Sequence, residues 1–194
     1  MPNVKGSVLR SRLEFVRDHF GAAGVQRLLD AMPDEDRVLL SGGLLPAQWY
    51  PFALGERLDR TVMQVLGGGD PEIFRRLGRR SADLNLAGVH AVFVHQSDPQ
   101  ALLRRAPAIY KLYYDTGYRV YEKIGERSCR LTTHASDSYS EADCLTVIGW
   151  HERAVELCGG HQPRVEHPNC RARGAPVCEY LISWGERRTA RTGG

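Results

Sequence analysis

The feature that most constrains the fold is a change in hydrophobic period along the chain. Over most of the first two thirds, apolar residues recur every three or four positions, which is the period of an amphipathic helix. Alternation of polar and apolar residues, the strand period, is confined to the last third. The chain is therefore expected to be α+β, a helical cluster packed on a small antiparallel sheet with a C-terminal β-hairpin.

The individual elements follow from this period and from glycine and proline punctuation. Helices are predicted over 7–20, 25–32, 54–66 and 142–157. Three further helices are expected: one that begins at 33–36, one that runs from 70–71 toward 94, and one that follows 97–99. Tyrosines up to Tyr118 and Tyr121 are assigned to the last of these helices, because their spacing is helical. Strands are predicted over 128–134, 162–169 and 177–184.

Length and composition set the class of protein. A chain of 194 residues without an internal repeat or a linker predicts one domain over 1–185, followed by a polar tail over 186–194. No apolar segment approaches the roughly 18 residues of a membrane span, and no secretion signal is present, so a cytoplasmic location is expected. The net charge of +3 and scattered arginines argue against nucleic acid as a partner.

The sharpest chemical feature is a group of three thiols and an imidazole in the last third. Five cysteines without a secretion signal favour free thiols or metal ligands over disulfides. Soft thiolates with one imidazole are the ligand set of a tetrahedral structural zinc, although buried core thiols would give the same residue types. The candidate ligands are Cys144, His167, Cys170 and Cys178.

The predicted hairpin carries a resemblance to a known family. A glycine, Gly174, stands between Cys170 and Cys178, and an aromatic residue, Tyr180, comes next in the second strand. In this stretch the sequence resembles the C-terminal part of the 4-vinyl reductase domain.

That resemblance implies a zinc site. Ligand-sensing members of the family hold zinc with an early cysteine, an acidic residue and the two hairpin cysteines, and the same spacings fall on the four candidate ligands of this chain. The departure is His167, where those members have a carboxylate. Glu166 is adjacent to His167 and would act as the ligand in its place if the register of this segment differed.

More loosely, the whole chain resembles a myxobacterial paralogous family without an assigned function. The Lys5-Gly6 start and Trp49-Tyr50-Pro51 contribute to this resemblance. The implied fold is that of the nitric-oxide-signalling and TRAPP superfamily, whose members sense, enclose ligands or act as scaffolds, often as dimers through helices.

Two further chemistries are disfavoured by the sequence. Haem requires a proximal histidine, for which His90 and His95 are candidates, but the tyrosine, serine and arginine signature of that superfamily branch is not recognisable. Cys158 and His161 are nearly adjacent, yet no carboxylate or oxyanion loop is marked beside them, so no enzyme is predicted.

The leading interpretation is a non-enzymatic small-molecule sensing or binding module with a structural zinc, functioning as a homodimer. The alternative is a protein-interaction or dimerisation scaffold with a filled core. An apolar ligand would lie against aromatic residues, since such rings commonly line ligand sites. The candidate pocket residues are Trp49, Tyr50, Phe52, Tyr110, Tyr113 and Tyr114.

Overall fold

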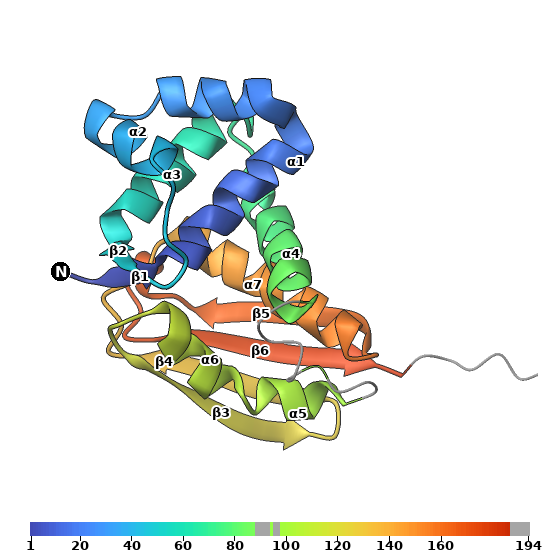
Figure 1. Ribbon diagram of the computed structural model, residues 1–194. Helices are drawn as coiled ribbons and strands as arrows, with labels where there is room; N and C mark the ends of the chain where they lie inside the picture. Colours follow the sequence, from blue (N-terminus) through green and yellow to red (C-terminus); the bar gives the residue numbers. More distant parts are fainter. Residues whose placement is uncertain (88–93, 95–97, 187–194) are drawn as a thin grey trace, which may run out of the picture.

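The computed structural model describes residues 1–87, 94 and 98–186 (Figure 1). These residues form an α+β fold, as the sequence predicts. In chain order the elements are β1 (Asn3–Lys5), α1 (Gly6–Asp30), α2 (Asp34–Ser41), β2 (Trp49–Pro51), α3 (Phe52–Val65), α4 (Glu72–Ala87), α5 (Pro99–Leu103), α6 (Ala106–Tyr113), β3 (Tyr118–Gly125), β4 (Ser128–His134), α7 (Glu141–Leu157), β5 (His161–Asn169), the 3-10 turn η2 (Arg171–Arg173) and β6 (Cys178–Gly185).

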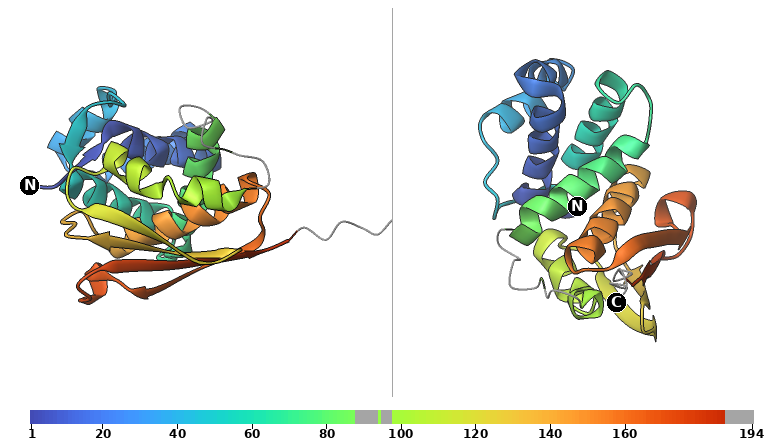
Figure 2. Two further views of the ribbon diagram at one scale, coloured as in Figure 1. Left: turned by 90° about the horizontal axis from the view of Figure 1, so that it is seen from below. Right: turned by 90° about the vertical axis from the view of Figure 1, so that its right-hand side faces the viewer.

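The main sheet has four strands in the order β3-β4-β6-β5, and every neighbouring pair is antiparallel. The helices lie over one face of this sheet, and the other face points away from them (Figure 2). β1 and β2 form a separate two-stranded sheet, which an isolated bridge between Val4 and Tyr114 joins to the end of α6. The predicted C-terminal hairpin is confirmed as β5 and β6.

Helix α7 packs against α4 so closely that the two backbones touch. A Cβ atom added at Gly78 would lie 1.9 Å from the Thr146 carbonyl oxygen. One added at Gly149 would lie 2.0 Å from the Arg75 carbonyl oxygen. Only glycine permits this contact, because any larger residue would push the helices apart. Ion pairs flank the contact: Arg75–Glu152 and Arg79–Glu156.

The tyrosine-rich helix predicted after Pro99 is wrong in its second half. The chain makes two short helices, α5 and α6, and then turns at Gly117, whose φ of 72° favours glycine. Tyr118 and Tyr121 consequently lie on strand β3. Their three-residue separation fitted a helix, but a stripe that crosses a helix-breaking glycine carries no information about the structure beyond that glycine.

Two other differences concern the N-terminal part and the chain beyond α4. Residues 7–20 and 25–32 fall in one helix, α1, apart from the terminal turn, with non-helical backbone at Gly21. Trp49 and Tyr50 form strand β2, which was not among the predicted strands. The predicted continuation of α4 toward Val94 and most of the predicted 186–194 tail lie outside the described residues.

In the described part of the chain, no helix is long and apolar enough to cross a membrane. The boundaries of the predicted single domain and the cytoplasmic location stay predictions.

Candidate metal and ligand site

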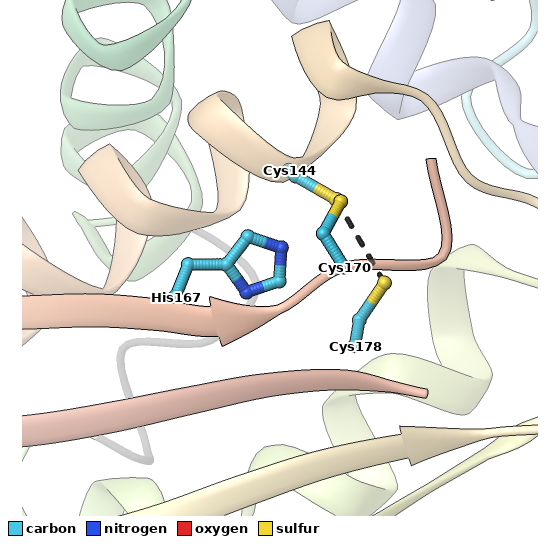
Figure 3. A group of neighbouring side chains, drawn as sticks. All are labelled: Cys144, His167, Cys170 and Cys178. Carbon is cyan, nitrogen blue, oxygen red and sulfur yellow. Dashed lines mark hydrogen bonds between the residues drawn. The ribbon is translucent and has the colours of Figure 1, made fainter. Parts of the chain in front are cut away.

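Four side chains from α7 and the C-terminal hairpin converge at one point. Cys144 lies in the first turn of α7, His167 on β5, Cys170 directly after β5, and Cys178 at the start of β6. Their ligand atoms all lie within 4.8 Å of one another, and the side chains point toward one another (Figure 3). The structure therefore brings together all four residues that the sequence indicates as ligands.

The separations of the sulfur atoms fit a tetrahedral metal. Zn–S bonds of about 2.3 Å at tetrahedral angles place two thiolates about 3.8 Å apart. The Sγ atom of Cys144 lies 3.7 Å from that of Cys170 and 3.9 Å from that of Cys178. All three thiols are buried, so they also form a compact part of the core between α7 and the sheet.

A backbone turn presents the two hairpin cysteines to the same point. The 3-10 turn after Cys170 ends at Gly174 in the left-handed region, and the Ala175 amide donates to the Cys170 carbonyl at 3.0 Å. The Arg171 amide donates to the Cys178 sulfur at 3.4 Å. The hydrogen bonds that the Cys178 sulfur makes with the Cys144 thiol and with this amide lower the pKa of Cys178, which favours the thiolate form that metals bind.

A backbone carbonyl orients the His167 ring. The Nδ1 atom lies 2.7 Å from the Glu179 carbonyl oxygen, so Nδ1–H donates there and the other nitrogen, Nε2, is the atom that the ring offers to a metal. Nε2 is buried without a hydrogen-bond partner among the described residues. A metal ion would satisfy this orphaned lone pair, and the carbonyl contact is the usual orienting partner of a metal-bound histidine.

Glu166, the alternative ligand, lies outside the cluster. Its side chain is 52% exposed and pairs with Arg164 at 3.0 Å. Successive residues of a strand point to opposite faces of a sheet, so β5 cannot present both His167 and Glu166 to the thiols.

A second feature is a cavity of about 70 Å³ between the helices and the sheet. Tyr110, Tyr113 and Tyr114 line it, together with residues that the sequence did not indicate. Trp49, Tyr50 and Phe52 do not: Trp49 packs under the Lys5 ammonium, and the other two lie in the N-terminal core. The additional lining residues include Arg12, Arg119, Trp150 and His151.

A buried ion network forms one wall of the cavity. Arg12 of α1, 2% exposed, contacts both carboxylate oxygens of Asp59, at 2.6 and 2.9 Å, and one oxygen of Asp143 at 3.4 Å. The Tyr114 hydroxyl donates to Asp143 at 2.9 Å. Burial raises the pKa of Asp143 to about 6 despite the neighbouring guanidinium. The network ties α1, α3, α7 and the end of α6 together.

His151 lines the cavity as a neutral imidazole. Burial, with a contribution from the nearby Arg119 charge, lowers its pKa to about 3. Its Nδ1 atom lies 2.8 Å from the Val147 carbonyl oxygen, one turn earlier in α7. Nδ1–H therefore donates to the helix, and Nε2 is the acceptor.

The low pKa of His151 predicts loss of stability in acid. The folded protein keeps the ring neutral down to about pH 3, whereas the unfolded chain takes up a proton near pH 6.5. Acidification within this window therefore favours unfolding, by up to about 1.4 kcal/mol per pH unit from this group. Urea unfolding of the wild type and of His151→Gln, each at pH 7 and at pH 5, measures the stability that acidification removes. The variant is expected to lose less stability between these pH values than the wild type. Equal losses would contradict the assignment.

Cys158 and His161, the nearly adjacent pair considered for catalysis, are poorly placed for it. Cys158 is fully buried at the end of α7, and His161 is exposed at the start of β5. Cys129 is also buried, and burial raises its pKa to about 12, which disfavours the reactive thiolate.

Helices enclosing a cavity over one face of an antiparallel sheet define an H-NOX-like fold, as solved structures show. An H-NOX protein from K. algicida, Fe(II) unliganded, is 14% identical with a TM-score of 0.72, covering 96% of this chain and all (100%) of that one. An H-NOX protein from S. oneidensis in the Fe(II)NO state is 17% identical with a TM-score of 0.72, covering 94% and 99%. At these identities, the likeness establishes the fold alone.

The chain itself belongs to the family described as protein of unknown function DUF2378, which it matches over residues 4–185. No curated protein matches the sequence. The resemblance to a myxobacterial family stays a prediction.

The prediction that haem is disfavoured is contradicted by these comparisons. A further similar structure comes from work on haem distortion in the H-NOX family; it is 14% identical, with a TM-score of 0.66, and the match covers 98% of this chain and 100% of that one. The fold is thus one that haem proteins use. The missing tyrosine, serine and arginine signature was a poor guide, because the fold persists at identities where short motifs do not. His90 and His95 lie outside the described residues.

Proposed function

We propose that this chain is a non-enzymatic module that senses or binds a small molecule, as one domain over 1–185. In this proposal a structural zinc ion fixes the hairpin against α7. Its ligands are Cys144, His167, Cys170 and Cys178.

The cavity is the observation that carries the binding function. Its wall is mostly apolar and aromatic, from Val8, Ile109, Val147 and Trp150, with a few polar groups among them. Small-molecule sites commonly have this composition. The scaffold alternative requires a filled core, which the cavity disfavours.

The four-residue cluster supports the zinc. The sulfur separations, the orphaned Nε2 atom of His167 and the resemblance to ligand-sensing 4-vinyl reductase domains all favour the same ligand set. Four protein ligands leave no open coordination position for water, so this metal would hold structure rather than catalyse hydrolysis.

Haem is a ligand to test, because similar folds belong to H-NOX proteins. Cofactor pockets have volumes of roughly 300–1,000 Å³. The present cavity is about 70 Å³, so haem would bind only if the surrounding helices moved apart. Neutral imidazole is a haem ligand, and His151 is the histidine of the described residues that lines this cavity.

The experiment is ligand capture by the full chain. Purified protein is titrated with haem, which is followed by its absorption band. It is also titrated with a panel of small molecules, which are followed by thermal unfolding and by tryptophan fluorescence, to which Trp150 at the cavity wall contributes. A saturable change that Val147→Phe abolishes by filling the cavity is the expected result. If no compound binds and the protein forms a stable dimer by sedimentation, the scaffold function replaces the proposed one.

A further inference from the structure

Arg119 is an arginine at the cavity wall whose charge is not neutralised by the described part of the protein. Its Nε–H donates to the Thr133 hydroxyl at 3.0 Å. The guanidinium carbon lies 4.9 Å from the ring centre of Tyr110 and 5.5 Å from that of Tyr180. Aromatic faces hold the group in place, but they leave its terminal N–H donors available to a ligand.

The other arginine of this wall, the buried Arg12, is neutralised. Arg12 is paired with Asp59 and Asp143. For Arg119, no carboxylate among residues 1–87, 94 and 98–186 lies within ion-pair distance, 4.0 Å. Asp143 lines an adjoining cavity of about 20 Å³ with Arg119, but it is already bound by Arg12 and Tyr114.

Arg119 stands where the two cavities meet. Tyr110, Tyr114, Arg119 and Val147 line both of them, so the guanidinium borders a cavity whose wall is largely apolar. His151 on the same wall is neutral and offers no competing positive charge. A cation without a counter-ion beside an apolar space is a site for an anion with an apolar body, because the pair would satisfy both groups.

We propose that the cavity binds a short-chain carboxylate, with the carboxylate on Arg119 and the carbon chain against Val147 and Ile109. This inference rests on the proposed function, since it names the ligand class of the same site. Size supports a small ligand: a cavity of roughly 150 Å³ holds benzene, and this one has about half that volume.

The test compares isosteric ligands that differ only in charge. The full chain is titrated calorimetrically with propionate and with propionamide at matched ionic strength. Propionate is expected to bind, and propionamide to bind at least about tenfold more weakly, because one charged pair is lost.

The variants locate the site. Arg119→Gln is expected to weaken propionate binding at least about tenfold, and Arg119→Lys less, since lysine keeps the charge but not the bidentate geometry. Arg164→Gln, whose side chain is 75% exposed on β5, is the matched control and should leave binding unchanged. Val147→Phe removes binding with the arginine intact, which provides a second route if Arg119→Gln misfolds.

The outcomes separate this inference from the proposed function. Equal binding of propionate and propionamide, or unchanged binding in a folded Arg119→Gln variant, overturns the carboxylate assignment. Binding of neutral molecules of similar size as tightly as propionate overturns it too, while the binding function stands. If nothing binds in the cavity, both proposals fail.

Discussion

Replacing Cys170 and Cys178 by serine is expected to remove one zinc ion per chain and to lower Tm by about 8–16 °C. A ligand present at a thousand times its Kd stabilises a fold by about 4 kcal/mol. For a chain of this size each kcal/mol corresponds to about 2–4 °C. Metal content by mass spectrometry and thermal unfolding, on protein purified without added metal, give the two quantities.

A matched control separates metal loss from core damage. Cys129→Ser changes another buried thiol, in the same core cluster but outside the four candidate ligands. It is expected to lower Tm while keeping the zinc. Wild-type protein without metal, and with the same Tm as the double variant, would refute the zinc site.

Replacing Arg12 by methionine is expected to cost about 3–5 kcal/mol, or a Tm decrease of about 6–20 °C, because two buried carboxylates lose their cation. Asp59 is 2% exposed and contacts Arg12 through both oxygens. Urea unfolding at pH 7 measures the loss.

The control is an exposed ion pair of the same helix. Arg10 lies 3.5 Å from Glu14 and is 45% exposed, so Arg10→Met should cost no more than about 1 kcal/mol. The double variant Arg12→Met/Asp59→Leu is expected to recover part of the loss, since it removes a stranded charge. Similar losses for Arg12→Met and Arg10→Met would show that the buried network contributes little.

The hydrophobic pattern of short segments predicted much of this fold, because interactions between residues close in sequence determine these elements. Capping at Asp70-Pro71 and the alternation in 177–184 indicated α4 and β6. Strand β3 was missed, since its pairing with β4 is non-local and its aromatic residues mimic a helical stripe. The sequence does not encode such pairing in a short window.

The cysteine cluster and the cavity also differed in how far the sequence could predict them. The hairpin cysteines are eight positions apart, with a turn between them, so their convergence could be predicted. Arg119 and His151 come from a strand and a helix far apart in sequence, and only packing brings them to one cavity. Burial and unpaired charge identify them, and neither is visible in residue type alone.

The glycine contact between α4 and α7 makes the shape of the cavity depend on residues that do not line it. With Gly78 against the Thr146 carbonyl, and Gly149 against that of Arg75, a Cβ atom at either position would collide with the backbone of the facing helix. Ser81 of α4 and Val147 of α7 line the cavity and lie within three residues of these glycines. A substitution at either glycine would therefore move two walls of the cavity apart while every lining side chain stays the same.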